Sequence, residues 1–461
     1  MLHPATDAVA SLADARFEQA ITRLSEYLAI PAISCDPDHF DDVRRLAARV
    51  RDDLAALGMN GCRVLELDGA LPIVVAEWHG RPGAPTVLIY GHLDLQPVKG
   101  ERWDTPPHVA TRVGDRLYAR GAADDMGGWM SHVAALQAWF DEAGGPPCNV
   151  KLIIEGEEEI GSPNLTRFMD TYPEVFEADV MVLTDCENPS VDVPGLTVSL
   201  RGLMEVEITC AALTADGHSG LWGNMVPDVS TALAKLIARL VDDNGRPTFG
   251  LIDVSEDWRA SAAAIDPEVI RDGAHIMDGL RSLPEAGRSA AEWLWRQPAI
   301  TVVATTYPTL DRKKNALRQS ASALLSVRLA PEHTQQGMLD EITALVTKDP
   351  PGGVQVTVTP KGWSGEGWLY TPRGAAFEAA DRAYQRAWGS PLRRVGVGGS
   401  IPFVAIFGQR YANLPLILNG VMDPRTTAHG PNESLHLGVF RKAIAANVYL
   451  LAELAALPRE A

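Results

Sequence analysis

The sequence predicts an α/β fold with a central, mainly parallel sheet, interrupted by an inserted α+β domain of the ferredoxin-like (βαββαβ) type. Short β-rich runs between residues 73 and 183 alternate with helical segments, which is the pattern of a parallel sheet. After residue 200 the order becomes strand, helix, two strands, helix and strand. The chain has 461 residues, more than the ~250 to 300 at which a single hydrophobic core usually divides.

The N-terminal part begins with helices and continues with strands. Apolar residues at helical spacing predict one helix over 9–28, which Pro31 ends, and another over 40–57, which ends at Gly58. β-branched and aromatic residues then predict a sheet with a helix inside it. Its strands are expected at 73–78, 86–90, 150–154 and 180–183, and its helix at 127–141.

The middle of the chain is predicted to be the inserted domain, which we expect to act as a lid and a dimerisation domain. Its strands are expected at 204–210, 300–304, 321–328 and 354–358, and its helices at 227–241 and 335–347. Residues 243–299 are additional material with no assigned function. Helices over 374–388 and 435–456 and a strand at 414–418 return to the first domain. The predicted catalytic domain is therefore 1–200 and 371–461, and the inserted domain is 201–370.

Composition excludes several classes of protein. The formal net charge of -18 disfavours nucleic acid or an anionic membrane as a partner, because both need concentrated Lys and Arg. The five cysteines are an odd number without CxxC spacing, so we expect reduced thiols and a cytoplasmic protein. The N-terminus has no basic segment leading into an apolar one, and no apolar run reaches the ~18 residues that span a bilayer.

Polar residues gather where the predicted strands end. His92 and Asp94 follow one strand, residues 155–159 (Glu-Gly-Glu-Glu-Glu) follow the next, and Asp185 follows a third. Since ligands of open α/β sheets bind beyond the carboxyl ends of strands, these residues are expected to meet at one crevice. The adjacent Asp124 and Asp125 lie at a predicted helix start. Alone they would be explained by the helix dipole, but beside the other carboxylates they suit hard cations.

Six motifs in order make a recognisable set. They are 91–97 (Gly-His-Leu-Asp-Leu-Gln-Pro), 120–125 (Arg-Gly-Ala-Ala-Asp-Asp), 155–162 (Glu-Gly-Glu-Glu-Glu-Ile-Gly-Ser), 216–220 (Asp-Gly-His-Ser-Gly), 398–402 (Gly-Gly-Ser-Ile-Pro) and 428–433 (Ala-His-Gly-Pro-Asn-Glu). Over nearly the whole chain this set resembles the dinuclear zinc peptidase superfamily of carnosinase, carboxypeptidase G, aminoacylase and succinyl-diaminopimelate desuccinylase. Gln96-Pro97 and the Glu-Gly-Glu-Glu-Glu run look most like the carnosinase-type dipeptidase branch. Met126 and Gly430 depart from it, since Lys and Ser are common at these two positions.

The resemblance implies two divalent metal ions per chain, with zinc expected and manganese or cobalt as alternatives. Carried over by position, Asp124 bridges the ions, His92 and Asp185 complete the ligands of one ion, and Glu159 and His429 complete those of the other. A carboxylate shared between two ions is the usual way to hold a dinuclear pair. The resemblance also implies a cis peptide between Asp124 and Asp125.

Two further acids are given roles from their spacing. Asp94 lies two residues after His92 on the same face of an extended segment, so we expect its carboxylate to accept the second ring N–H of that histidine. Glu158 and Glu159 diverge in an extended backbone, which makes Glu158 the predicted general base, taking a proton from metal-bound water and passing it to the leaving amine. Glu157 is expected to be a solvated acid, and His132 a packed or surface residue.

Substrate contacts are expected from the inserted domain and from a glycine turn. Arg328 ends an apolar strand, where it suits either a bidentate clamp on a substrate carboxylate or an interdomain salt bridge. Asn315, Gly399 and Ser400 resemble substrate-binding positions of the dipeptidase branch. His218, in a glycine-flanked loop, is expected to stabilise the oxyanion, and in the family this histidine comes from the partner subunit.

We therefore expect a homodimer formed through the inserted domains, in which His218 of each chain contributes to the active site of the other chain. Hinges are expected near residues 200 and 370. The alternative is that His218 only caps a turn within its own chain.

The predicted function is a dizinc metallopeptidase that hydrolyses dipeptides or small peptides with a free C-terminal carboxylate, as dipeptidases and carboxypeptidases do. The expected reaction is attack by a metal-bound hydroxide with Glu158 as base. An N-acyl amino acid deacylase of the same superfamily is the alternative, because it needs the same metals, base and clamp. A non-catalytic binding protein on this fold is a third possibility, against which the intact ligand set and base argue.

Overall fold

The computed structural model describes residues 2–399, 402–411 and 414–457. Its largest sheet has six strands in the order β1-β2-β6-β3-β7-β17, with β6, β3, β7 and β17 mutually parallel and β1 and β2 antiparallel at one edge. The predicted mainly parallel α/β sheet is confirmed. The strands are β1 (Asn60–Leu65), β2 (Ile73–Trp78), β3 (Thr86–His92), β6 (Asn149–Glu155), β7 (Val180–Leu183) and β17 (Leu416–Leu418).

Helices cover both faces of this sheet, which explains why its strands are continuous apolar runs. Alternate residues of one strand enter two separate cores: Val74 and Ala76 of β2 belong to one, Ile73 and Val75 to the other. The first core contains α1 (Thr6–Ala15), α2 (Phe17–Leu28), α3 (Phe40–Leu57), α4 (Met126–Ala143), α13 (Ala375–Trp388) and α15 (Leu437–Ala455). The second contains α5 (Leu165–Thr171), α6 (Pro173–Phe176) and α14 (Pro402–Arg410).

The single helix predicted over 9–28 is wrong, because the chain forms two helices that meet at Arg16. The backbone of Arg16 (φ -97°, ψ 10°) leaves the helical region between α1 and α2. Val9 in α1 and Leu24 in α2 are both fully buried. The apolar spacing therefore continues across the break between the two helices, so the sequence pattern alone does not show that break.

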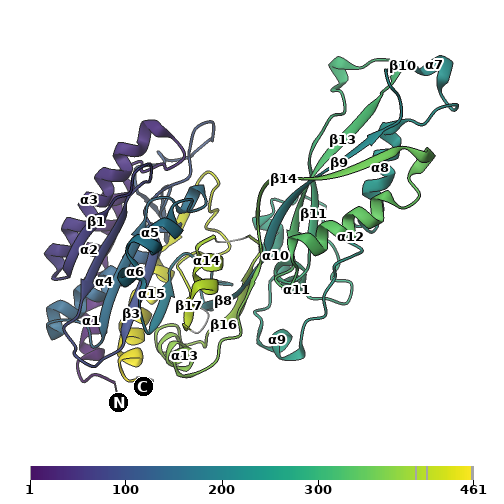
Figure 1. The fold of residues 1–461 in the computed structure, drawn as a ribbon. Helices are drawn as coiled ribbons and strands as arrows, with labels where there is room; N and C mark the ends of the chain where they lie inside the picture. Colours follow the sequence, from purple (N-terminus) through teal and green to yellow (C-terminus); the bar gives the residue numbers. More distant parts are fainter. Residues whose placement is uncertain (1, 400–401, 412–413, 458–461) are drawn as a thin grey trace.

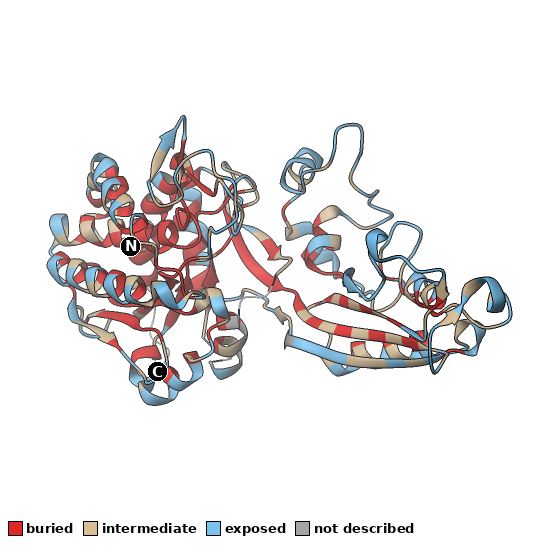
Figure 2. Cartoon of the chain, turned by 90° about the horizontal axis from the view of Figure 1, so that it is seen from above, coloured by how far each residue is buried: buried red, intermediate tan, exposed pale blue. Residues whose placement is uncertain are grey.

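A second, antiparallel sheet is built from the middle of the chain. Its order is β11-β13-β9-β14, with α8 (Val229–Ala238) and α12 (Gln335–Thr347) on one face. This is the predicted βαββαβ arrangement. Figure 1 shows it as a separate, elongated part, and Figure 2 shows alternating burial along its strands. The strands are β9 (Gly202–Ala211), β11 (Ala299–Thr305), β13 (Ser320–Leu329) and β14 (Gln355–Gly365).

A small third sheet, which the sequence did not predict, joins the two parts. It has the order β15-β8-β16 and consists of β8 (Gly195–Leu200), β15 (Trp368–Leu369) and β16 (Arg393–Val397). β8 leads directly into β9, and Trp368 of the returning chain pairs with Leu200, so both connections between the parts run side by side.

Residues 243–299 pack against this joining sheet. They contain α9 (Glu256–Ser261), α10 (Pro267–Gly273) and α11 (Ala290–Trp295). The Ala263 N–H donates to the Arg394 carbonyl of β16 at 2.9 Å, and the Gly396 backbone lies against Trp295. In the described residues, none of the helices has both the length and the apolar character needed to cross a bilayer.

Candidate metal centre

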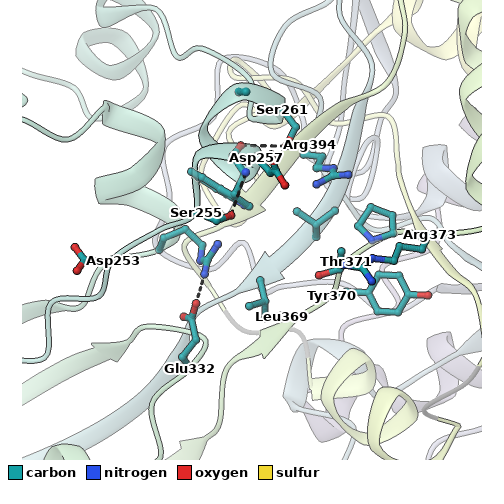
Figure 3. Close-up of a pocket in the computed structure, with 15 residues that line it drawn as sticks. Asp253, Ser255, Asp257, Ser261, Glu332, Leu369, Tyr370, Thr371, Arg373 and Arg394 are labelled. Atoms are coloured by element: carbon teal, nitrogen blue, oxygen red, sulfur yellow. Dashed lines mark hydrogen bonds and ion pairs between the residues drawn. The ribbon is translucent and has the colours of Figure 1, made fainter.

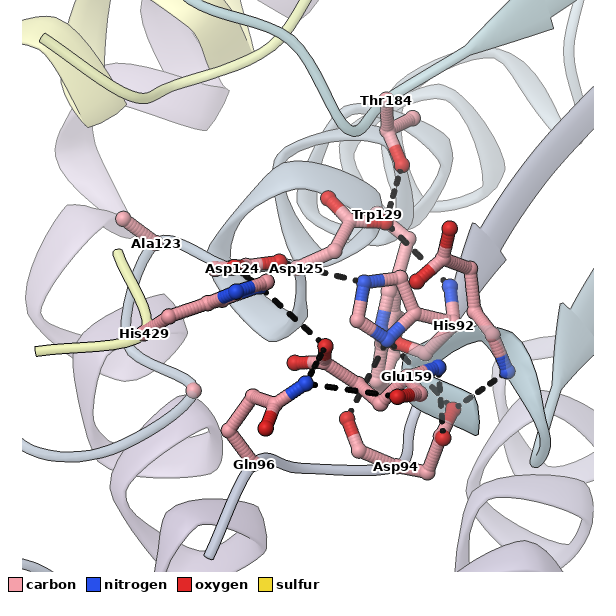
Figure 4. Close-up of polar contacts among 12 residues, drawn as sticks. His92, Asp94, Gln96, Ala123, Asp124, Asp125, Trp129, Glu159, Thr184 and His429 are labelled. Atoms are coloured by element: carbon pink, nitrogen blue, oxygen red, sulfur yellow. Dashed lines mark hydrogen bonds and ion pairs between the residues drawn. The ribbon is translucent and has the colours of Figure 1, made fainter. Parts of the chain in front are cut away.

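The structure brings the five predicted ligands together at the carboxyl ends of the parallel strands. Figure 4 labels four of them, His92, Asp124, Glu159 and His429. β3 supplies its last residue, His92, and the loops after β6 and β7 supply Glu159 and Asp185. The donor atoms form two groups, each within 4.8 Å: His92, Asp124 and Asp185 in one, and Asp124, Glu159 and His429 in the other. Asp124 belongs to both groups.

The two carboxylate oxygens of Asp124 face different histidines. Oδ1 lies 3.2 Å from His92 Nε2, and Oδ2 lies 3.1 Å from His429 Nε2. His429 Nε2 is also 3.2 Å from Glu159 Oε2. One carboxylate thus reaches both sets of donors, as a bridging ligand must. The expected cis peptide between Asp124 and Asp125 is present.

The side chain of the neighbouring Asp125 lies inside the protein and accepts hydrogen bonds there. Its Oδ2 accepts hydrogen bonds from the Thr184 hydroxyl at 2.7 Å and from the His92 backbone N–H at 3.2 Å. Asp125 is fully buried, so the adjacent carboxylates have separate surroundings.

The charges at this site fit divalent cations. Burial and the charge of Asp124 raise the pKa of Asp185 to about 7, and burial and the charge of Asp124 also raise the pKa of Glu159. Hydrogen bonds to Asp124 and Glu159 raise the pKa of His429 to about 11. Such perturbations arise where carboxylates crowd without a counterion, and bound cations would relieve the repulsion. Imidazole and carboxylate donors suit zinc, manganese or cobalt.

The ring of His92 is oriented by Asp94, through the backbone carbonyl of Asp94 more than through the predicted carboxylate contact. Nδ1 of His92 lies 3.1 Å from the backbone carbonyl of Asp94 and 3.5 Å from its carboxylate. The carboxylate accepts the backbone N–H groups of Glu158 at 3.2 Å and Glu159 at 3.0 Å. Asp94 therefore holds both the imidazole and the turn that carries the two glutamates.

This turn differs from the predicted extended backbone, because Glu158–Ile160 form a short 3-10 helix. The prediction of a solvated Glu157 is wrong. Glu157 is 4% exposed and accepts hydrogen bonds from the Leu71 N–H at 2.8 Å and from the Asn164 side chain at 2.9 and 3.0 Å. A run of acids cannot reveal which member turns inward, since backbone donors decide it.

Replacement of Glu157 by alanine is expected to lower the free energy of unfolding by about 2 kcal/mol, because the Leu71 N–H and the Asn164 amide lose their buried acceptor. Urea unfolding monitored by circular dichroism measures this change. The exposed Glu66 is the control, and its alanine variant is expected to stay within about 0.5 kcal/mol of the parent. Equal stability of the two variants would contradict the structural role of Glu157.

Glu433 joins the last motif to the loop that carries Asp124. It is fully buried and accepts the backbone N–H groups of Gly121, Ala123 and Asp124, each at 3.1 Å, and Nη1 of Arg120 at 3.0 Å. The pairing of β18 (Ser434–His436) with β5 (Arg116–Tyr118) brings these segments together. The sequence placed Glu433 in a motif but gave no sign of this role.

Glu433→Gln is expected to weaken metal retention by about 10- to 100-fold, because a glutamine amide would meet backbone donors with a donor of its own. Dialysis against graded chelator, followed by elemental analysis, measures the retention. Glu292→Gln is the control, since Glu292 is also buried and ion-paired but lies in α11, away from the donors. Equal metal loss in both variants would show that Glu433 has no specific effect on the site.

The cleft beside the donors has a volume of about 580 Å³. Glu158, Gln96 and Gly399 line it together with four of the candidate ligands, Asp124, Glu159, Asp185 and His429. Gln96 Nε2 donates to Glu159 Oε2 at 2.8 Å and so orients that carboxylate. The predicted Ser400 lies outside the described residues.

The predicted contacts of the inserted part are not beside the donors in this chain. His218 ends β10 (Gly217–His218), which lies at the far end of the inserted part in Figure 1. β10 pairs with β12 (Ala316–Leu317), and Asn315 directly precedes β12. Nδ1 of His218 accepts the Gly220 N–H at 3.0 Å, so the ring does cap a turn, and the residue is exposed. Arg328 is half-buried near Arg201 and forms no ion pair within the described residues; burial and the charge of Arg328 lower the pKa of Arg201 to about 10.

Comparison with known proteins agrees with this geometry. The family model described as "Peptidase family M20/M25/M40" matches residues 88–453, a stretch that contains all five candidate ligands. The chain belongs to this peptidase family.

Individual M20-family proteins are similar along most of their length. The chain is 31% identical over 422 residues to a cysteinylglycine-S-conjugate dipeptidase of Corynebacterium striatum, covering 91% of both chains. It is 27% identical over 456 residues to the human Beta-Ala-His dipeptidase, covering 92% of this chain and 87% of that protein. The crystal structure of human carnosine dipeptidase 1 has the same fold, with a TM-score of 0.77, 24% identity, and coverage of 99% of this chain and 100% of that one.

Proposed function

We propose that this M20-family chain is a dinuclear metallopeptidase that hydrolyses dipeptides or small peptides with a free carboxylate. The observation that carries the proposal is Asp124, whose two oxygens face two groups of donors at an open cleft. The similarity to proteins named cysteinylglycine-S-conjugate dipeptidase and Beta-Ala-His dipeptidase supports a dipeptide as substrate.

His92, Asp124 and Asp185 would hold one divalent ion, and Asp124, Glu159 and His429 the other. Ions bound there would polarise the scissile carbonyl and acidify a water molecule. Glu158 lines the same cleft without belonging to either donor group. Its carboxylate would accept the proton of the attacking water and deliver it to the leaving amine.

Burial and nearby carboxylates, Asp185 foremost, raise the pKa of Glu158, although His92 opposes them. Asp94 positions this base by accepting its backbone N–H. A base fixed in this way keeps its geometry through both proton transfers.

Arg328 and Arg201 would recognise the free carboxylate of the substrate. Neither guanidinium has an acidic partner in the described part of the chain, and Arg201 is only 9% exposed. Arg201 donates to the carbonyl of Gly398, which precedes the cleft-lining Gly399. A substrate carboxylate held between this turn and Arg328 would supply the missing negative charge.

A homodimer formed through the inserted part would bring His218 of the partner to the cleft. The neighbourhood of His218 is unusually apolar for a surface: Leu221 is 70% exposed, Trp222 55% and Met225 79%. β11 adds an open sheet edge with Val302 and Val303 exposed. Exposed apolar side chains and an unpaired edge are typical of protein interfaces.

Assays with zinc, manganese or cobalt against dipeptides and matched N-acyl amino acids test the proposal. A dipeptidase should hydrolyse free dipeptides faster than their N-acetylated counterparts, whereas preference for N-acyl amino acids would favour the deacylase alternative. Absence of both activities in protein that retains its metals would leave only a binding function. A cytoplasmic location stays a prediction from the free cysteines.

A further inference from the structure

A second cleft, of about 660 Å³, lies at the junction of the two parts and shares no lining residue with the cleft at the donors (Figure 3). Its walls come from β8, β16, the returning connection 369–373, α9 and the loop after β13. The volume is in the range of sites for small molecules, ~300 to 1,000 Å³. The proposed catalytic mechanism makes no use of it.

One wall of this cleft is already fixed by internal contacts. The guanidinium of Arg296 lies over the ring of Trp258 at 5.1 Å and pairs with Glu332. Arg296 is 4% exposed and Trp258 6% exposed, so both are held by packing. A preformed wall lowers the entropic cost of binding a ligand.

The remaining charges are separated along the cleft. In Figure 3, Arg373 and Arg394 lie toward one end, with Asp257 near Arg394, and Asp253 lies at the opposite end. Among the described residues, none of these four side chains is within ion-pair distance of an opposite charge. The first end therefore keeps a net positive charge, and Asp253 leaves the other end negative.

Apolar surface connects the two charged ends. Val198, Leu369, Tyr370 and Pro372 also line the cleft, and in Figure 3 Leu369 lies between the two charged ends. A ligand that matches this surface carries a carboxylate at one end, an ammonium group at the other and an uncharged middle. A free peptide of a few residues has this chemistry.

We propose that this cleft is a second binding site, for a short free peptide whose carboxylate meets Arg373 and Arg394 and whose ammonium group meets Asp253. The match between the charges of this cleft and those of a free peptide does not depend on whether the metal centre hydrolyses the same peptide. Both chain connections between the two parts border the cleft. A change in the orientation of the inserted part would therefore change the distance between the two charged ends, and a bound peptide would favour the orientations that keep this distance.

Calorimetric titration of metal-loaded Glu158→Gln protein with triglycine tests the proposal, since loss of the base would keep the peptide intact. We expect two binding events per chain. Chelation of the metals should remove one event, the one at the metal centre, and leave the other. N-acetyl-triglycine and triglycine amide, each lacking one terminal charge, should bind the remaining site about tenfold more weakly than triglycine.

Arg394→Gln and Asp253→Asn should each weaken the metal-independent event about tenfold. The controls are Arg393→Gln and Glu256→Gln, whose exposed side chains neighbour the cleft residues in sequence without lining it. They should leave the event unchanged. Absence of a metal-independent event, or one that neither Arg394→Gln nor Asp253→Asn changes, overturns the proposal. Loss of the metal-dependent event alone would instead count against the proposed function.

Discussion

Replacement of Glu158 by alanine is expected to lower kcat by about 10²- to 10⁴-fold while the chain retains its divalent ions. Glu158 lines the cleft but belongs to neither donor group, so its loss should remove the proton acceptor and leave the ligands intact. Steady-state kinetics with a dipeptide and elemental analysis of the same preparation measure the two quantities together.

Glu187 provides a matched control for this experiment. It lines the same cleft, and within the described residues its side chain makes no hydrogen bond or ion pair. Glu187→Ala should therefore reduce kcat far less than Glu158→Ala. If both variants lost activity equally, the effect would come from the charge of the cleft, and Glu158 would not be the base.

His218→Ala is expected to lower kcat by about 10²- to 10³-fold, the effect of removing one donor to a developing oxyanion. This prediction depends on the proposed dimer, because His218 lies at the distal end of its own inserted part (Figure 1). The ring already accepts the Gly220 N–H through Nδ1, which leaves Nε2 as the nitrogen available to donate.

Mixing the His218→Ala and Glu158→Ala proteins tests whether active sites are shared. In a heterodimer, one site would contain Glu158 from one chain and His218 from the other, so activity should return as subunits exchange. Exchange demonstrated by differently tagged chains without any recovery of activity would show that His218 acts only in its own chain. Its capping of the turn before Gly220 would then be its whole role.

The parts of the fold that could be predicted are those with strong local signals. β2 and β7 have the predicted bounds because both faces of the sheet are covered and the strands are continuous apolar runs. β1 was missed because it is an edge strand whose first residues are exposed. The joining sheet was missed because β15 has two residues and its pairing with β8 links distant segments.

In the candidate site, too, features with a local sequence signal could be predicted, and contacts between distant segments could not. The family resemblance carried by the six motifs predicted the residues of both donor groups, and the structure brings those residues together. It could not predict that Glu157 turns inward or that Glu433 gathers three backbone N–H groups. These contacts join segments that are far apart in the chain, and only the folded backbone determines which donors an acid meets.

The measurement that tests the central claim most directly is the metal content of the purified chain after zinc reconstitution and removal of excess metal. Two groups of donors that share Asp124 should retain two divalent ions per chain, and Asp124→Ala, which removes a donor from both groups, should retain far less. One ion or none per wild-type chain would contradict the dinuclear site.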